Sequence, residues 1–312
     1  MTAENRNFAL RAGICILLAA IMVGVSELAG EKEIIFPEIT ALTVGAIVAP
    51  KQSWKVSRMR MVLLIAVCSV LGILIVRYSP LPKAANLIGA FLICQVLFLL
   101  SCTSFAPMIS AAALPVLMDT ETIIYPISAV TMTLLTVTAQ FLLEKCGRYE
   151  HEEFTPLPTP DRFKWLSALL RTATAAALAV PVIHFGVNFC VAPPLLVAFT
   201  EFSNPAGKAR SKPVKTVFII TGCALSGAIF RLVLCELLPL PLTVAAIFSV
   251  ACALVIMRSA GQYIPPAGAL AVLPMIIPAK ALLIYPAEIF AGASLLMLAA
   301  LAIGKVPAGK KS

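Results

Sequence analysis

Two arginines inside apolar stretches are the first residues that could do chemistry. Arg231 lies in GAIFRLVLCELL, and Arg258 directly precedes a proline-rich stretch. In a membrane, a full positive charge costs at least about 2.5–3.5 kcal/mol, so such a residue is a candidate for binding an anion. The alternatives are that Arg231 reaches outward to the interface or pairs with Glu236, and that Arg258 is an interface anchor.

Three glutamates are candidates for the same reason. Glu38 and Glu201 flank short apolar segments, and Glu288 lies several residues into the last one, where Ser128 occupies the matching place of the first half. These carboxylates would be the residues to test if the solute were a cation. Because each is near the end of its segment, an interfacial position is the alternative.

Two uncharged, proline-containing stretches form the second kind of candidate. They read SFAPMISAAALPVLM at 104–118 and YIPPAGALAVLPMIIP at 263–278. An interrupted helix exposes backbone N–H groups with about half a unit of positive charge, which an anion can approach where side chains are small. The candidate solute-binding residues here are Pro107, Met108, Ser110, Pro265, Pro266 and Gly268. The alternative is that the prolines only kink packed helices.

The composition indicates the surroundings of these residues. Apolar residues make up 60% of the chain and charged residues 12%, against about 45–50% and about 25% in soluble domains. We therefore predict an all-α integral membrane protein, a polytopic bundle, in which the first apolar run is a retained helix and not a cleaved signal peptide. The apolar segments lie at about 8–26, 34–50, 61–76, 84–101, 106–118, 122–143, 165–184, 189–203, 214–234, 239–257, 264–278 and 281–304.

The segments form two tandem repeats. Pro107 corresponds to Pro266, Tyr125 to Tyr285 and Lys145 to Lys305, at roughly constant separation. We predict membrane repeat 1 at 1–146, a charged, proline-rich cytoplasmic linker at 147–162 and membrane repeat 2 at 163–312. In each repeat the second and fifth segments are short: about 13–15 residues give roughly 20 Å of helix, against a hydrocarbon core of roughly 30 Å.

Lysine and arginine placement predicts the orientation. The basic loop at 51–60 and its counterpart at 208–215 should face the cytoplasm, as should both termini, the C-terminus through Lys305, Lys310 and Lys311. If each repeat crosses six times, the repeats are parallel and both loops lie inside. If the fifth segment dips in and returns, each repeat crosses five times and the repeats are inverted. The charge pattern favours six crossings in a multi-pass protein of the plasma (inner) membrane.

Several other classes are excluded by what the sequence lacks. The nine cysteines form no CxxC pair, which argues against a disulfide framework or a zinc site. The net charge of +9 is spread over loops, which favours contact with anionic lipid and not with nucleic acid. No phosphate-binding loop is present and no segment offers a nucleophile with a base, so we expect neither ATP-driven transport, nor an enzyme, nor a cofactor.

One family resemblance rests on the second half. PPLLVAFTEFSNPAGKARSKP at 193–213, followed by a span and then YIPPAGALAVLP, resembles the HPP family of integral membrane proteins. Pro265 and Pro266 fit the family signature, with Ile264 in place of its histidine and Ala106-Pro107 at the matching place of the first half. Some members are linked to nitrite transport, so the resemblance implies a small-anion permease.

Two functions remain open. The first is a secondary transporter or facilitator of a small solute, an inorganic or small organic anion such as nitrite, bound at the proline-broken segments of the two repeats. The second is a membrane scaffold or biogenesis protein without a transport path. The expected partners are the solute and the lipid bilayer, and the sequence does not define the oligomeric state.

Overall fold

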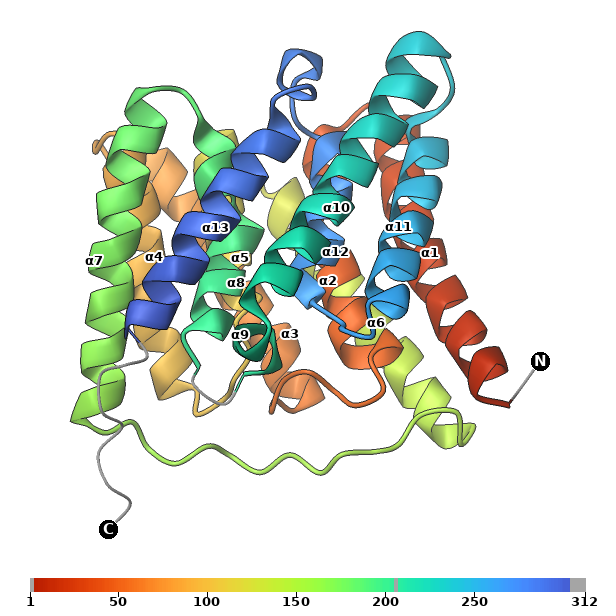
Figure 1. Cartoon of the computed structure of the whole chain (residues 1–312), viewed down its shortest axis with the longest axis horizontal. Coiled ribbons are helices and arrows are strands. Elements are labelled where there is room, and N and C mark those ends of the chain that lie inside the picture. Colours follow the sequence, from red (N-terminus) through yellow and green to blue (C-terminus); the bar gives the residue numbers. More distant parts are fainter. Residues whose placement is uncertain (1–2, 205–206, 304–312) are drawn as a thin grey trace.

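A computed structural model describes residues 3–204 and 207–303, and over those ranges the regular elements are all helical (Figure 1). The helices are α1 (Ala3–Ala29), α2 (Glu38–Thr43), α3 (Arg58–Tyr78), α4 (Lys83–Leu100), α5 (Met108–Met118), α6 (Ile124–Lys145), α7 (Arg162–His184), α8 (Pro193–Phe202), α9 (Lys208–Ser211), α10 (Pro213–Arg231), α11 (Leu242–Ser259), α12 (Pro265–Val272) and α13 (Tyr285–Ile303). Within the described residues, 8 helices are long and apolar enough to cross a membrane. The prediction of a polytopic helical membrane bundle is confirmed.

The second and fifth segments of each repeat are short helices at the centre of the bundle. They are α2 and α5 in the first repeat and α8 and α12 in the second. A π-helical turn, Val44–Val48, continues α2, and a 3₁₀ turn, Leu273–Met275, continues α12. Every residue of α2 and of α12 is buried. The long helices therefore enclose the short ones (Figure 1).

Prolines stand at the start of all four short helices, and Pro37 is the residue before α2. Pro265 and Pro266 open α12, the pair at 193–194 opens α8, and Pro107 is the residue before α5. A proline fits the first turn because the N–H group that it lacks would have no partner there, and its fixed φ suits the helix. These prolines therefore start short helices and do not kink long ones. Pro115, inside α5, is different.

The two repeats enter the bundle from the same face. Helices α1 and α7 both begin where the linker crosses the molecule, along the bottom of Figure 1. Arg148 in the linker donates from Nη1 to Asn7 Oδ1 at 2.9 Å, and Asp161 accepts from the backbone N–H of Lys164 at 2.9 Å as it caps α7. We name this side the linker face and the other the opposite face. Each half contributes four of the eight long apolar helices and two of the short ones.

Equivalent contacts recur in the two repeats. The Tyr125 hydroxyl donates to the carbonyl oxygen of Ala111 at 3.1 Å, and the Tyr285 hydroxyl donates to that of Leu270 at 2.8 Å. Each tyrosine lies at the start of the last long helix of its repeat and holds the short helix before it. The matching sequence motifs therefore make matching tertiary contacts.

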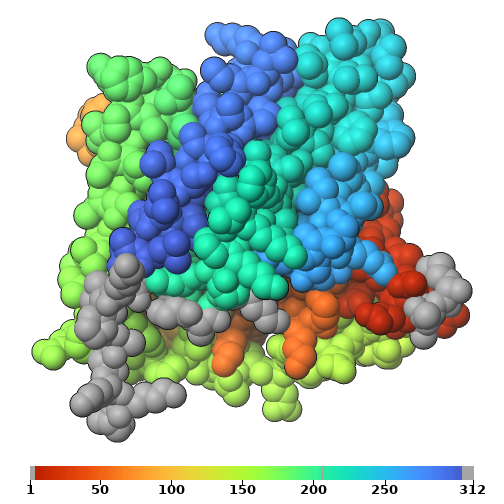
Figure 2. Space-filling view, in the orientation of Figure 1, coloured from red at the N-terminus to blue at the C-terminus, as the bar shows by residue number. Residues whose placement is uncertain are grey.

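The outer surface of the bundle is apolar. Figure 2 shows α7, α13, α10 and α11 side by side on one face, with the linker below them. Large apolar side chains on these helices are exposed, among them Leu169, Val180, Phe218, Val255 and Leu298. Such a surface is suited to lipid hydrocarbon, which solvates apolar side chains without the cost they incur in water.

Candidate functional site

The first turn of α2 lies between the first turns of α5 and α12. Ser110 of α5 donates from its hydroxyl to Glu38 Oε1. On the other side, a Cβ added to Gly268 of α12 would lie 3.1 Å from Thr40 Cγ2 and 3.3 Å from the Thr40 carbonyl oxygen. Residues two apart on a helix point to nearly opposite sides, so Glu38 faces α5 and Thr40 faces α12. We name Glu38, Thr40, Ser110 and Gly268 the central junction.

The central junction is buried and incompletely hydrogen-bonded. Glu38 is 1% exposed, and Thr40 and Ser110 are 0% exposed. Glu38 Oε2 and Thr40 Oγ1 have no hydrogen-bond partner among the described residues. Because a buried polar atom without a partner is costly, each such atom in a folded protein calls for an explanation.

A basic side chain meets the C-terminal end of each short helix. The four contacts are Arg11 Nη1 to the carbonyl of Ile47 at 3.4 Å, Lys83 Nζ to that of Leu117 at 3.3 Å, Arg210 Nη1 to that of Phe202 at 3.5 Å, and Arg231 Nη1 to that of Pro274. Cations at helix C-termini balance the negative end of the helix dipole. All four negative ends are therefore compensated at the two faces.

The positive ends are balanced less fully in the described part of the chain, although some first-turn N–H groups have acceptors, such as that of Ala267 at the carbonyl of Ile264. The first turns of α2, α5 and α12 meet inside the bundle, and Glu38 is the acidic residue among them. Each such end carries a partial positive charge, of about half a unit in a full-length helix. The arrangement of dipoles therefore favours negative charge at the central junction and disfavours a cation.

Seven of the residues singled out from the sequence lie together. Ser110, Gly268 and Glu38 make the contacts of the central junction. The other four precede or begin the same short helices, and they are Pro107, Met108, Pro265 and Pro266. The proline stretches of the two repeats thus converge on one place through α2, which touches both.

Arg231 and Glu288 lie away from the central junction, towards the opposite face. Arg231 donates to the carbonyl of Ile277 at 2.7 Å as well as to that of Pro274, and its Nη2 lies 3.5 Å from Glu236. Glu288 Oε2 accepts from the backbone N–H of Phe189 at 2.8 Å. Both side chains thus form hydrogen bonds with backbone groups at the ends of short helical segments.

Arg258 and Glu201 lie towards the linker face. Arg258 stacks over the ring of Phe8 at 3.8 Å and donates to Asn5 Oδ1 at 2.5 Å. Glu201, near the end of α8, accepts from the indole N–H of Trp54 at 2.8 Å. Neither residue contacts the central junction, so a role for either would have to be at the entrance to a path.

A buried polar chain between the repeats was not predicted from the sequence. Arg171 of α7 donates from Nε to Gln95 Oε1 at 2.9 Å, and Gln95 Nε2 of α4 donates to Thr200 Oγ1 of α8 at 2.9 Å. The available signal was a long polar side chain, Gln95 or Arg171, within each of two apolar segments. Thr40 was also missed, because nothing in its spacing separates it from the threonine at 43.

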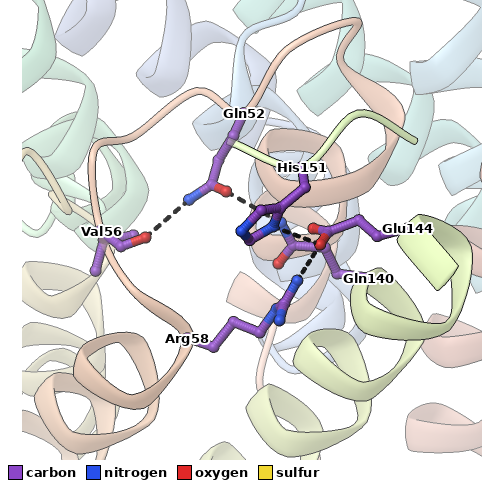
Figure 3. A network of polar contacts seen from close by, with 6 residues as sticks. All are labelled: Gln52, Val56, Arg58, Gln140, Glu144 and His151. Atoms are coloured by element: carbon purple, nitrogen blue, oxygen red, sulfur yellow. Dashed lines mark hydrogen bonds and ion pairs between the residues drawn. The ribbon is translucent and has the colours of Figure 1, made fainter. Parts of the chain in front are cut away.

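A second polar network holds the linker (Figure 3). Glu144 at the end of α6 accepts from Arg58 of α3 and contacts His151 of the linker, with 2.7 Å between the glutamate Oε2 and the imidazole Nδ1. Beside it, Gln140 donates to Gln52 Oε1 at 3.0 Å. These side chains line a hollow of about 260 Å³ that is open at the linker face. The network fixes one end of the linker to the first repeat.

Among the described residues there is no group of three or more histidine, cysteine, aspartate or glutamate side chains that could hold a metal ion. Comparison of the chain with family models, with curated proteins and with solved structures finds no match. The resemblance to the HPP family therefore stays a prediction from the sequence motifs.

Proposed function

We propose that this protein is a secondary transporter or facilitator of a small solute, and that the solute is an anion such as nitrite or another inorganic or small organic anion. The observation that carries the proposal is the central junction, where the first turns of three short helices from both repeats meet around two buried oxygen atoms without partners. Short, interrupted helices at matching positions of two repeats commonly form the solute site of a transporter near the middle of the bilayer.

The charge distribution supports an anion. Basic side chains neutralise the C-terminal ends of the four short helices, while the N-terminal ends of three of them, α2, α5 and α12, meet at the junction. Backbone N–H groups at helix N-termini bind anions without a fixed full charge that would trap them. Among the candidate residues, Arg258 would act earlier, by attracting an anion at the linker face.

The orientation is part of the proposal. Basic residues of both repeats, including Lys55, Arg60 and Lys212, belong to loops or helix ends at the linker face. By the positive-inside rule the linker face is cytoplasmic, and the protein is a multi-pass protein of the plasma (inner) membrane. The residues at 304–312, which include the lysines of the C-terminal tail, lie outside the described part of the chain.

The test combines anion uptake with a substitution that the fold should tolerate. The purified protein is placed in liposomes and uptake of nitrite, nitrate, chloride and formate is measured. Thr40→Val keeps the shape of the side chain and removes a buried hydroxyl that has no partner, so the fold should be as stable or more stable. If the hydroxyl binds the solute, uptake should fall several-fold. Gly268→Leu is less informative, because the crowding against Thr40 would disturb the packing itself.

The matched control is Thr136→Val in α6, where the buried hydroxyl donates to its own helix, at the Met132 carbonyl, at 3.0 Å. This variant should lose a little stability and keep its uptake. Uptake by Thr40→Val at the wild-type rate would place the path elsewhere. Absence of uptake of every anion in the wild type would favour the alternative, a scaffold or biogenesis protein without a transport path.

A further inference from the structure

We infer that Glu38 is a proton-binding residue that couples the anion to protons, so that the protein is a proton–anion symporter. The inference rests on the proposed function, because it assigns the coupling ion to the same site. It also assigns a role to Glu38, the acid of the central junction. An anion site on its own does not need an acid.

The surroundings of Glu38 contain no cation that could balance its charge. On α5 the facing group is the Ser110 hydroxyl, and on α12 the sequence PPAGALAV has no titratable side chain. Tyr125 of α6 is directed to the Ala111 carbonyl. On α1, the titratable Cys15 lies against α2, with its Sγ 2.9 Å from Thr43 Oγ1.

Arg11 of α1 lies too far along α2 to balance the charge of an ionised Glu38. Arg11 reaches the carbonyl of Ile47, at the other end of the α2 segment from Glu38. Over residues 3–204 and 207–303, no lysine, arginine or histidine forms an ion pair with Glu38. The helix N-termini at the junction supply partial charges but no full cation, and a fully buried carboxylate without a cation is disfavoured against the neutral acid. In the closed bundle, Glu38 therefore holds a proton.

The two carboxyl oxygens have different roles in this state. Oε1 accepts from Ser110, and Oε2 has no partner among the described atoms, so Oε2 is the oxygen that can carry the proton. A protonated Oε2 is a hydrogen-bond donor. It would add a donor to the positive helix ends at the place where an anion binds.

Binding of the anion and of the proton must then support each other. An anion at the helix N-termini and an ionised Glu38 would repel, whereas an anion and the neutral acid would not. Because coupling between two bound species is reciprocal, the anion raises the proton affinity of Glu38 and the proton raises the affinity for the anion. For a monovalent anion and one proton, the pair crosses without net charge.

The other two candidate acids, Glu201 and Glu288, do not lie at the place where the anion would bind. Glu201 accepts from the Trp54 indole, and Glu288 accepts from the Phe189 backbone N–H. Each lies near a face of the bundle, away from the first turns of α2, α5 and α12. Glu288→Gln is therefore a suitable control for the loss of a carboxylate that does not bind the coupling proton.

The experiment uses the full-length protein in liposomes with nitrate as probe, since nitrate stays ionised and does not leak as a neutral acid. With one pH unit of difference, acid outside, one proton per nitrate would support about tenfold accumulation. We expect accumulation by the wild type, by Glu38→Asp and by Glu288→Gln, and none by Glu38→Gln. In parallel, the infrared C=O stretch of a protonated carboxylic acid is measured in the wild type and in Glu38→Gln, and it should be lost in the variant.

Accumulation by Glu38→Gln to the wild-type level would overturn the inference, as would uptake that follows a sodium gradient and ignores pH. Absence of the protonated-acid band from the wild type would also overturn it. If the wild type transports no anion at all, the proposed function fails. The infrared measurement needs no solute and still shows whether Glu38 binds a proton, so the two failures are distinguishable.

Discussion

Gly72 of α3 and Gly227 of α10 make the same close contact in the two repeats. A Cβ on Gly72 would overlap the carbonyl oxygen of Ala112 in α5, and a Cβ on Gly227 would overlap that of Ala271 in α12. In both cases a proline, Pro115 or its counterpart at 274, is also within contact distance. Each short helix is thus packed backbone to backbone against a long helix of its own repeat.

Alanine at either glycine should destabilise the protein. Because the obstacle is backbone, we expect a cost of about 1–3 kcal/mol or more, typical of overpacking. Gly89→Ala in α4 is the control, since a Cβ there meets nothing within 4 Å and alanine suits a helix better by about 1 kcal/mol. The measurement is the apparent melting temperature in detergent. Equal melting temperatures for all three variants would contradict the packing.

The prolines that begin the short helices should matter for transport more than for folding. Ile264 is extended, with φ −122° and ψ 96°, and a following proline favours that conformation. Replacing Pro107, Pro265 and Pro266 by alanine removes this restriction and lets the helices start earlier. We expect normal expression and a several-fold fall in anion uptake. Pro80→Ala, in an exposed loop at the opposite face, is the control, and full activity of the triple variant would show that the prolines do not shape the site.

Thiol labelling of intact cells tests the parallel arrangement of the repeats. Cysteines at Ser53 and Ser211, both exposed at the linker face, should be protected from an impermeant reagent if that face is cytoplasmic. Leu81→Cys, exposed at the opposite face, should react. The background should lack Cys146, which is exposed. Reaction of only one of the two loop cysteines would refute parallel repeats.

The sequence predicted the spans and the short segments well because each reflects a local requirement. A helix that crosses lipid needs a long apolar stretch. Because the two halves repeat, the proline stretch of one half could be checked against that of the other. These features can be read from neighbouring residues. The role of the prolines stayed open between a helix break and a kink, and the structure places them at helix starts, where a missing N–H is tolerated.

The contacts of the central junction could not be predicted in this way. Glu38 and Ser110 are 72 residues apart, and Thr40 meets Gly268 in the other repeat. Helix α2 carries one glutamate and two threonines. Which of these side chains meets a given neighbouring helix depends on how α2 is rotated about its axis. The same holds for Arg231, for which the sequence left three options and whose partners proved to be backbone carbonyls together with Glu236.

The linker network should be weakened by Glu144→Gln. The carboxylate holds both Arg58 and His151, and further along the linker the N–H of Leu157 donates to the Cys102 carbonyl at 2.8 Å. Loss of the negative charge should release one end of the linker. We expect limited proteolysis to cut at 147–161 several-fold faster than in the wild type. Asp119→Asn, which weakens an ion pair with Lys83 at the opposite face, should leave the rate unchanged. Equal rates for the two variants would contradict the role of the network.

The three residues of the buried polar chain, Arg171, Gln95 and Thr200, should contribute jointly to the stability of the protein. Gln95→Leu leaves the guanidinium of Arg171, which is 7% exposed, without its acceptor. We expect a loss of about 1.5–3 kcal/mol, the usual worth of a hydrogen bond to a charged group.

The double variant separates the hydrogen bond from the cost of a buried charge. In Arg171→Leu with Gln95→Leu no charge remains, and the Thr200 hydroxyl keeps its bond to the Leu196 carbonyl at 3.1 Å. Replacing a whole buried polar set by apolar side chains is often close to neutral. The double variant should therefore melt at a higher temperature than Gln95→Leu alone, although it carries one more substitution. Melting temperatures that fall additively would show that the residues do not act as a unit.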